Sequence, residues 1–518
     1  MSQQAEQFKK IVAHCKEYGF VYPSSEIYDG LSAVYDYGPY GVELKNNLKR
    51  YWWESMTKLH ENIVGLDAAI FMHPKTWKAS GHVDAFNDPL IDNKDSKKRY
   101  RADVLVEDHI QKIQEKINKE VKKAEKRFGE AFDKAQFLET NGRVLEYSKQ
   151  IAEITERLAT AMTDGDLDSL KQLIVDLDIT CPESGSRNWT EVRQFNLMFS
   201  TQLGTIAGEE SKLYLRPETA QGIFVNFLNV QKTTRQKIPF GIAQVGKAFR
   251  NEIVARQFIF RMREFEQMEM QFFVKPGEEM QWYEFWKDFR MKWHRALGTP
   301  EDKLQFHDHD NLAHYANAAV DIQFDFPFGF KELEGIHSRT DFDLKSHEAF
   351  SGKKMQYFDP EEEKSYIPYV VETSIGCDRM FLATLSQALQ EETVPDAEGK
   401  DSTRTVMKLH PAIAPVKCAI LPLLKNKEEL TQKAREVFDR LKFSFQCQYD
   451  EKDAIGRRYR RQDAIGTPYC VTIDFDTLED DTVTIRDRDT LVQERVPISA
   501  LEGIIRDKVD MNNLLRAL

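Results

Sequence analysis

The stretch from Phe249 to Glu269 constrains the fold most, because FRNE, RMREF and EQME place polar residues at strand-like intervals. Side chains of an extended strand alternate between two faces, so we expect Arg250 and Glu252 on one face, about 7 Å apart. The same parity puts Phe265 and Glu269 together, about 13 Å apart. A guanidinium suits a phosphate, a carboxylate suits an amino or ammonium group, and an aromatic ring covers a purine. The sequence therefore predicts a nucleotide site built on strands.

A nearby string, GIAQVGKA from Gly241 to Ala248, comes one residue short of a phosphate-binding P-loop. That loop needs Ser or Thr after its Lys, because the hydroxyl holds Mg²⁺. Ala248 stands there instead, and the surrounding residues are typical of a strand. We therefore do not expect a P-loop nucleoside triphosphatase.

Composition sets the outer limits of the fold and of the function. The 518 residues predict two to four domains, and the net charge of -12 argues against a general nucleic-acid coat, although a local basic face remains compatible with it. No apolar stretch has signal-peptide or membrane-span character, so we expect a soluble cytoplasmic protein without membrane contact. The six cysteines form no CxxC pair, which indicates neither a disulfide framework nor a zinc knuckle.

Two regions differ from the rest in their periodicity. From Glu107 to Asp178 the chain is charged, with apolar residues at helical spacing, which predicts two or three inserted helices. Two interpretations of these helices stay open, a nucleic-acid contact or a self-packed, solvated hairpin. The apolar positions are Ile110, Ile113, Ile117, Val121 and Ala124, then Ile151, Ile154 and Leu158, then Leu167, Leu170, Ile174 and Leu177.

After LHPAIAPVKC, strands and helices alternate, which predicts a compact mixed α/β domain beginning near Pro411. Its basic cluster has two open interpretations, a nucleic-acid contact or the solvated face of a helix. The cluster consists of Arg457, Arg458, Arg460 and Arg461.

Histidines gather in QFHDHDNLAHY, at His307, His309 and His314. Their spacing matches no coherent set of metal ligands. We therefore expect a loop and a helix start here rather than a metal site.

Three strings occur in the order of the class II aminoacyl-tRNA synthetase signatures. GLSAVYDYGPYGVELKNNLKRYWWESM, followed by a strand IVGLDAAIF that closes at Pro74, resembles the first signature, which forms the dimer interface in that family. FRNE with Arg261 and Phe265 resembles the second, and VVETSIGCDR, ending in Arg379, resembles the third. The resemblance implies a catalytic domain on an antiparallel sheet, with ATP as a substrate, and a homodimer.

Glu218, Glu269 and Glu372, with Ser374 on the strand face of Glu372, are candidates to surround the substrate amino acid. Several acids around one ammonium leave little room for a side chain, which favours glycine. Together LRPETAQGIF, FRNEI, REFEQME, ELEGIHSRTDFDL, ETSIGCDR and GRRYRRQDAIGTPYC resemble the dimeric glycyl-tRNA synthetase family along nearly the whole chain.

The chain departs from that family at two positions. Thr373 stands where the family usually has Pro, and CPESG keeps Cys181 but has Ser184 in place of the second Cys of a CPxCG pair. A bound zinc is therefore not expected.

The resemblance implies an α/β (α+β) fold with a class II catalytic domain at 1–410, a mainly helical insertion at 103–180 and a mixed α/β anticodon-binding domain at 411–518. It assigns phosphate contacts to Arg250, Arg261 and Arg379, with Gly376 adding helix N-terminal donors, and adenine contacts to Phe265 and Glu252. The further ATP-binding positions that it implies are Asn251, Phe260, Glu332 and Leu333.

Glycine would contact Glu218, Glu269, Glu372, Ser374, Phe265 and Gly376, and Arg101 and Arg339 are candidates for its carboxylate. Glu332 is a candidate ligand of Mg²⁺, a cation that prefers hard oxygen ligands. The resemblance also implies tRNA(Gly) as a partner, with Arg457, Arg458, Arg460 and Arg461 as candidate contacts. Positioning and charge stabilisation carry such chemistry, so no nucleophile or general base is required.

Two other function classes stay open. A non-catalytic, nucleic-acid-binding relative would keep the fold but is expected to lose Arg250, Glu252 or Arg379, and all three are present. A class II synthetase for serine or threonine would keep the ATP residues and change the pocket, and the three carboxylates argue against it.

Overall fold

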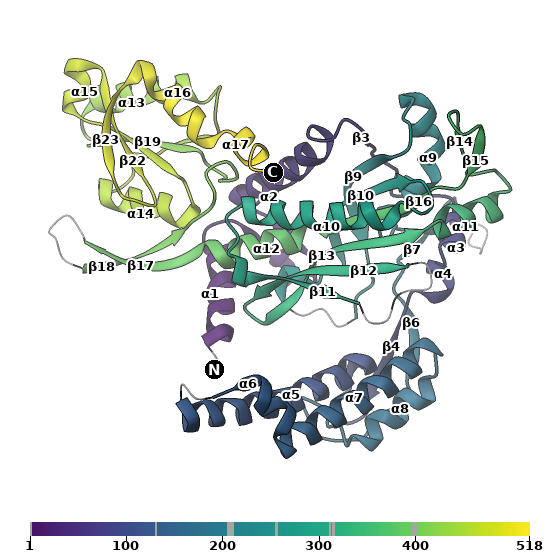
Figure 1. The fold of residues 1–518 in the computed structure, drawn as a ribbon. Helices are drawn as coiled ribbons and strands as arrows, with labels where there is room; N and C mark the ends of the chain where they lie inside the picture. The colour runs from purple at the N-terminus through teal and green to yellow at the C-terminus, as the bar shows by residue number, and fades with distance from the viewer. Residues whose placement is uncertain are drawn as a thin grey trace. The chain divides into compact units, whose positions relative to one another are not determined.

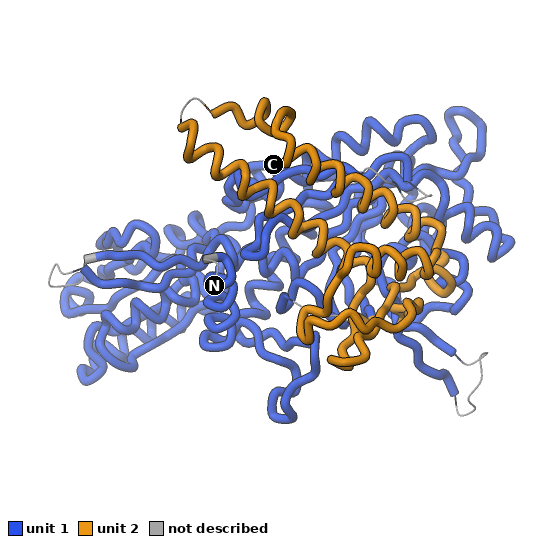
Figure 2. The backbone as a smooth tube through the Cα atoms, turned by 90° about the horizontal axis from the view of Figure 1, so that it is seen from below, with its two compact units in different colours: residues 1–80, 199–250, 256–518 blue, residues 81–198, 251–255 orange. Residues whose placement is uncertain are grey.

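The computed structural model describes residues 3–129, 132–204, 212–253, 257–309, 312, 316–395 and 401–518. The chain divides into two compact units, shown in two colours in Figure 2. Unit 1 comprises residues 1–80, 199–250 and 256–518, and unit 2 comprises residues 81–198 and 251–255. No helix among the described residues has both the length and the apolar character needed to cross a membrane.

The centre of unit 1 is a seven-stranded sheet (Figure 1). Its order is β11 (Leu304–Asp308), β12 (Ala318–Phe326), β13 (Gly329–Thr340), β16 (Tyr369–Gly376), β10 (Glu264–Val274), β9 (Phe240–Phe249) and β3 (Ile63–Gly65). All neighbours are antiparallel except β3, which runs parallel to β9. The predicted antiparallel sheet is confirmed, and GIAQVGKA lies in strand β9 rather than in a P-loop.

One face of this sheet is apolar and the other is polar. Met268, Met270, Ile336 and Ile375 belong to one buried core with side chains of three helices, α2 (Pro39–Thr57), α10 (Glu279–Ala296) and α12 (Cys377–Ala388). The intervening residues point to the opposite face, since strand side chains alternate. That face therefore carries the polar residues of β10, β13 and β16.

Strand β13 has a β-bulge opposite Ile322 and Gln323 of β12, where one extra residue shifts the alternation of its side chains. Leu333 and Glu334 are consecutive, yet both are buried, while Glu332 is exposed. An extra residue in one strand allows two neighbours to point to the same side. The bulge thus keeps Glu332 on the polar face.

The remaining elements of unit 1 before residue 411 surround the sheet. They are α1 (Gln3–Glu17), β1 (Val21–Pro23), η1 (Glu26–Tyr28), β2 (Tyr35–Tyr37), α3 (Pro74–Ala79), β7 (Ser200–Gln202), β8 (Lys212–Tyr214), α9 (Ala220–Thr234), η4 (Phe258–Phe260), η5 (Glu301–Lys303), α11 (Phe342–Ser351), β14 (Tyr357–Asp359), β15 (Lys364–Tyr366), β17 (Leu389–Pro395) and β18 (Asp401–Met407).

Three local predictions differ from the structure. Strand β9 ends at Phe249, so the expected strand parity of Arg250 and Glu252 is wrong. The expected long strand IVGLDAAIF is only Ile63–Gly65, because β3 pairs with β9 over three residues. His307 lies in strand β11, not in a loop or helix start, and His314 lies outside the described residues.

Unit 2 combines a small sheet with helices. Strands β5 (Lys98–Arg101), β4 (Asn87–Asn93) and β6 (Arg193–Asn196) form the sheet, in that order. The helices are α4 (His82–Ala85), α5 (Ala102–Phe128), α6 (Lys134–Thr140), α7 (Gly142–Thr163) and α8 (Leu167–Asp176). The apolar positions expected on inserted helices do pack together here, while the unit extends beyond 103–180 to include the three strands.

The last part of unit 1 is a five-stranded mixed sheet with its own core. Its order is β20 (Cys447–Tyr449), β19 (Cys418–Pro422), β21 (Tyr469–Ile473), β22 (Thr482–Asp487) and β23 (Gln493–Pro497). The helices are α13 (Glu428–Leu441), α14 (Ile455–Ile465), α15 (Phe475–Asp480), α16 (Ile498–Val509) and α17 (Met511–Leu515). The mixed α/β character predicted after Pro411 is confirmed.

Candidate active site

Three carboxylates gather on the polar face of the large sheet. Glu269 of β10 and Glu372 of β16 are 2% and 4% exposed, and the amide of Gln271 donates to both, at 3.3 Å from Glu269 Oε1 and 2.6 Å from Glu372 Oε2. Glu218, just before α9, accepts from Gln221 Nε2 at 3.0 Å and is close enough to repel the charge of Glu269. The three predicted substrate acids therefore form one cluster.

These acids carry different charges although they are close together. Burial, together with repulsion from Glu372 and Glu218, raises the pKa of Glu269 well above its ordinary value. Burial acts in the same direction on Glu372, but Arg339 and His337 outweigh it and lower its pKa. Neighbouring acids commonly separate in this way, one holding a proton and one staying ionised. The surroundings thus favour the protonated form of Glu269 and the ionised form of Glu372.

The guanidinium group of Arg339 donates hydrogen bonds to two protein carboxylates, Asp343 and Glu372. Its Nε and Nη2 atoms donate to Asp343 at 2.9 and 3.1 Å, and Nη1 donates to Glu372 Oε2 at 3.1 Å. His337 Nδ1 lies 2.9 Å from the other oxygen of Glu372. These contacts fix the orientation of Glu372, and they favour a positioning role for Arg339.

The remaining predicted substrate residues follow the sheet register. Ser374 pairs with Glu269 across the β10–β16 ladder, and its hydroxyl accepts from Gln267 Nε2 at 3.4 Å. Phe265 lies on the same face of β10 as Glu269, as its parity predicts. Gly376 ends β16 and caps the N-terminus of α12.

Two arginines, Arg250 and Arg379, lie close to the aromatic residues predicted for the ATP site. The guanidinium carbon of Arg250 is 5.2 Å from the centroid of the Phe265 ring, and Arg250 Nε donates to the Pro217 carbonyl at 3.1 Å. Arg379, in the first turn of α12, donates to Glu332 Oε2 at 3.0 Å and lies 4.4 Å from the Phe260 ring centroid. The structure thus groups two predicted phosphate-binding arginines with predicted ATP-site side chains.

Arg261 and Glu332 differ in their pairing. No described residue hydrogen-bonds or pairs with the Arg261 side chain, which is half-buried and available to a ligand. The charge of Arg379 lowers the pKa of the exposed Glu332, so this carboxylate stays ionised. Phe260 and Leu333 are 7% and 2% exposed and belong to the core, so any ATP contact of Leu333 would come from its backbone.

Three predicted site residues belong to unit 2. Arg101 pairs with Asp88 at 3.1 Å and with Asp103 at 2.5 Å. The backbone nitrogen of Asn251 donates to Leu197 at 2.8 Å, and Glu252 is 7% exposed. Their roles toward a substrate remain predictions from the family resemblance.

Sequence reasoning missed the polar residues that hold the acids in place. Thr219 contacts Glu269 through its hydroxyl, and its backbone nitrogen donates to Gln267 Oε1 at 3.2 Å. Gln267 and Gln271 share the parity of Glu269 in the string EQMEMQ, and this was the available signal. Asp343, which binds Arg339, gave no signal, because its partner comes from a different element.

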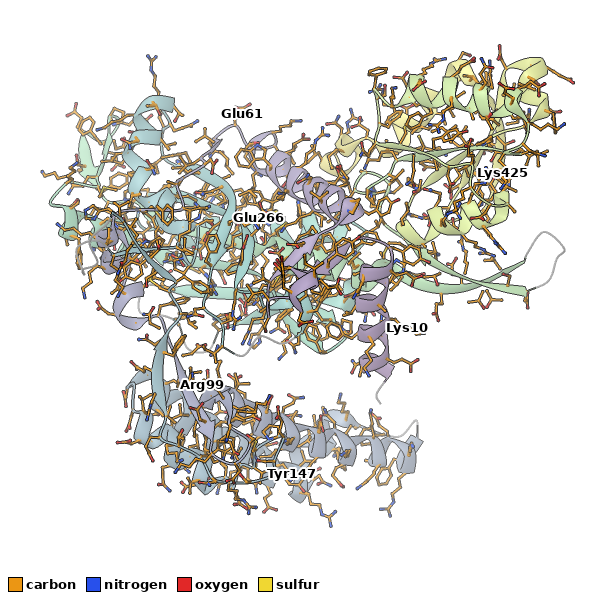
Figure 3. The ribbon with its side chains drawn as sticks, turned by 180° about the vertical axis from the view of Figure 1, so that it is seen from behind. Lys10, Glu61, Arg99, Tyr147, Glu266 and Lys425 are labelled. Atoms are coloured by element: carbon orange, nitrogen blue, oxygen red, sulfur yellow. The ribbon has the colours of Figure 1, made fainter. Side chains whose placement is uncertain are left out.

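A second missed network anchors the start of α12 to β10. Asp378, next to Arg379, accepts from Lys45 Nζ at 2.7 Å and from the backbone nitrogen of Glu266 at 2.7 Å. Glu266, labelled in Figure 3, also pairs with Lys45 at 3.3 Å and with Lys49 at 3.2 Å. This network holds the helix that presents Arg379.

The predicted basic cluster on α14 is not one continuous surface. Arg458 is 1% exposed and donates to three carbonyls, Pro422 among them, so its prediction as a tRNA contact is wrong. Arg461 pairs with Asp450 and Asp453, both at 2.7 Å, and Arg460 donates to Ser402 at 3.2 Å. Arg457 is exposed on the helix.

Comparison with known proteins agrees with this arrangement. Residues 201–388 match the tRNA synthetase class II core domain (G, H, P, S and T), residues 88–197 match glycyl-tRNA synthetase insertion domain 1, and residues 417–508 match an anticodon binding domain. The glycine–tRNA ligase of Chlorobaculum tepidum is 52% identical over 96% of this chain and 99% of its own. The chain belongs to the glycine–tRNA ligase family.

Other members of that family give the same picture. The glycine–tRNA ligase of Macrococcus caseolyticus is 51% identical over 97% of this chain and 99% of its own. That of Staphylococcus haemolyticus is 49% identical over the same shares. The class II catalytic core, the insertion and the anticodon-binding domain that the resemblance implied are therefore shown for this chain.

Proposed function

We propose that this chain activates glycine with ATP and transfers it to the 3′ end of tRNA(Gly). The observation that carries this proposal is the cluster of Glu218 with the buried Glu269 and Glu372, on the same sheet face as Phe265 and close to the arginines. In the first step the glycine carboxylate attacks the α-phosphate of ATP and pyrophosphate leaves. In the second, a terminal hydroxyl of the tRNA attacks the adenylate carbonyl and AMP leaves.

The acids select glycine through its ammonium group and through its lack of a side chain. Glu372, oriented by Arg339 and His337, supplies an anion for the ammonium. Glu269 and Glu218 would accept further ammonium protons, and Ser374 adds a hydroxyl beside them. A larger substrate would displace one of these groups or leave it desolvated and unpaired, at a cost of about 1–3 kcal/mol for each.

The arginines position ATP and stabilise the charge that develops on its phosphates. Arg250, Arg261 and Arg379 offer guanidinium groups, which bind phosphate oxygens in pairs and stay ionised. Phe265 would stack on adenine. Glu332 is ionised, exposed and hard enough to hold Mg²⁺, which would neutralise charge on the outer phosphates.

Three further properties belong to this proposal. The exposed Arg457 on α14 would contact tRNA, since this helix lies within the match to an anticodon binding domain. The chain would act as a cytoplasmic homodimer, with α2 and β3, the elements of the first signature, at the interface. Two alternatives are a class II synthetase for another small amino acid and a non-catalytic tRNA-binding relative. A pyrophosphate-exchange assay distinguishes both from a glycine enzyme.

The test is glycine-dependent exchange of labelled pyrophosphate into ATP by Arg250→Ala and by Arg295→Ala as a matched control. Arg295 is a surface residue whose described ion pair is with Glu301, at 2.8 Å, so its loss should leave exchange unchanged. Arg250→Ala should reduce exchange at least a hundredfold while the melting temperature stays near that of the parent. Exchange within a few-fold of the parent would contradict the role of Arg250.

A further inference from the structure

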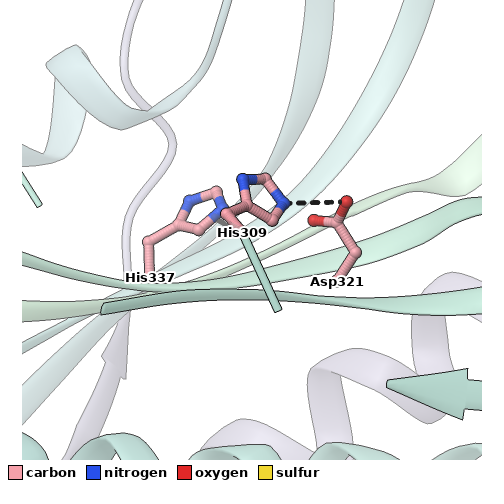
Figure 4. A group of neighbouring side chains, drawn as sticks. All are labelled: His309, Asp321 and His337. Atoms are coloured by element: carbon pink, nitrogen blue, oxygen red, sulfur yellow. Dashed lines mark ion pairs between the residues drawn. The ribbon is translucent and has the colours of Figure 1, made fainter. Parts of the chain in front are cut away.

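A cluster of two histidines and one aspartate lies on the polar sheet face beside the acids. His309, Asp321 and His337 each offer a ligand atom, and these atoms all lie within 4.8 Å of one another (Figure 4). His309 Nε2 and Asp321 Oδ2 are 3.0 Å apart. The side chains of His309, Asp321 and His337 are 35%, 12% and 24% exposed, so an ion from solvent can reach them.

The sheet register explains why these residues meet. Asp321 on β12 pairs with Gly335 on β13, and His337 follows Gly335 by two residues, on the same face. A Cβ atom on Gly335 would lie 3.0 Å from Cε1 and 3.1 Å from Nε2 of the His337 ring. The missing side chain therefore leaves room for the ring to lie beside Asp321. The backbone nitrogen of His309 donates to Ala319 of β12 at 3.1 Å, which brings the third ligand to the strand.

The environment of His337 is that of a metal-binding histidine. Its Nδ1 lies 2.9 Å from Glu372 Oε1, and its other ring nitrogen, Nε2, is on the side of Gly335 and Asp321. Histidines that bind metals usually donate their second ring nitrogen to a carboxylate, which fixes the tautomer and the ring orientation. Glu372 thus orients the His337 ring without being a metal ligand itself. It also connects the two histidines and Asp321 to the group of three glutamates.

We propose that His309, Asp321 and His337 bind one divalent ion of the zinc class, with at least one coordination position left for water. Two imidazoles and a carboxylate suit zinc, cobalt or nickel, whereas Mg²⁺ and Ca²⁺ prefer an all-oxygen set. The site uses no sulfur and is separate from the expected Mg²⁺ ligand Glu332. It does not depend on the amino acid that the enzyme activates.

Sequence spacing did not indicate this site, because the ligands come from three neighbouring segments. His309 follows β11, Asp321 lies within β12 and His337 lies within β13. The local string HDHDNLAH has no coherent ligand spacing, and the described ion pair of His309 is with Asp321. Cross-strand register, rather than sequence spacing, brings the ligands together.

The experiment uses the full chain after removal of metal with a chelator. Co²⁺ is titrated in, and its visible absorption reports coordination by protein nitrogen and oxygen atoms. The parent should bind one ion per chain at micromolar concentration or below. Asp321→Asn and His309→Gln should weaken binding at least tenfold, and His307→Gln, on the neighbouring strand, should leave it unchanged.

Two further measurements keep a negative result from being ambiguous. Circular dichroism before titration shows whether each variant is folded, and zinc X-ray absorption of the parent reports ligand type. A nitrogen and oxygen shell without sulfur is expected. Binding only at millimolar metal, equal binding by the parent and both site variants, or a sulfur ligand would overturn the proposal.

Discussion

At the scale of single residues, the central feature is a cluster of acids whose protons are shared unequally. Burial and two neighbouring carboxylates favour a neutral Glu269, while Arg339 and His337 keep Glu372 ionised. An ammonium entering this cluster changes the balance, because an adjacent cation favours the ionised form of a carboxyl group. Proton uptake or release on glycine binding therefore tests whether Glu269 and Glu372 contact the ammonium group.

We predict that glycine binding releases a proton from Glu269. The pKa of Glu269 is raised in the free protein and should fall when the ammonium arrives, so glycine affinity should rise as the pH rises through the pKa of Glu269 in the free protein. Calorimetry in buffers of different ionisation enthalpy measures the proton count. Glu269→Gln should abolish the release, and a parent that binds glycine with no proton exchange would contradict the assignment.

The acids themselves could be predicted from the sequence, since Glu218, Glu269 and Glu372 stand in recognisable strings. Their charges could not, because Arg339 reaches Glu372 through a tertiary contact. The same limit applies to Arg458, which the sequence places in a basic cluster and the fold buries against carbonyl groups. Residue type was informative, whereas pairing and burial depended on the fold.

At the scale of elements, helix α10 and strand β13 are joined by an ion pair on the apolar side of the sheet. Arg290 Nε donates to Glu334 Oε1 at 2.5 Å, and His294 Nε2 lies 2.8 Å from Glu334 Oε2. The side chains of Arg290, His294 and Glu334 are fully buried. Removing one partner leaves an uncompensated charge in the core.

Arg290→Met should accordingly lower the free energy of unfolding by about 3–5 kcal/mol, as measured by denaturant titration. The double variant Arg290→Met with Glu334→Gln should recover part of that loss, because the buried carboxylate is then gone. Arg295→Met, at the exposed end of the same helix, should change stability by no more than about 0.5 kcal/mol. Equal losses in the single and double variants would argue against the ion pair as the cause.

The sequence predicted whether a segment is a helix or a strand better than it predicted where that segment ends. The helical face from Ile113 to Ala124 and the strand parity of Phe265 and Glu269 are as predicted, because both depend on local periodicity. The chain leaves β9 at Phe249, one residue before Arg250. Sheet pairing decides where a strand ends, and that information lies in the neighbouring strands.

At the scale of the whole molecule, the order of the signatures indicated the catalytic region. Helical periodicity indicated the insertion, and alternating strands and helices after Pro411 indicated the C-terminal domain. The three strands of unit 2 were missed, since they are short and flank a strongly helical region. Likewise, the four arginines of α14 looked equivalent in the sequence, and the fold separates them into exposed and buried positions. Their separation gives a test of tRNA binding.

Arg457→Gln should weaken tRNA binding and reduce the salt slope of the association constant by about one, as expected when one phosphate contact is lost. Arg458→Gln should instead destabilise the fold, by about 1–3 kcal/mol, because it removes buried donors to carbonyl groups. Filter binding at several salt concentrations and thermal melting separate the two outcomes. Unchanged tRNA affinity in Arg457→Gln would remove α14 from the proposed interface.

The most direct measurement is the discrimination between glycine and alanine in ATP–pyrophosphate exchange by the parent protein. An apolar pocket separates substrates that differ by one methyl group by only about 1–3 kcal/mol. A pocket closed by Glu218, Glu269 and Glu372 should exceed that range in the ratio of kcat/KM, because alanine must displace a buried acid. The remaining amino acids should be inactive. Alanine or serine activated as efficiently as glycine would contradict the account.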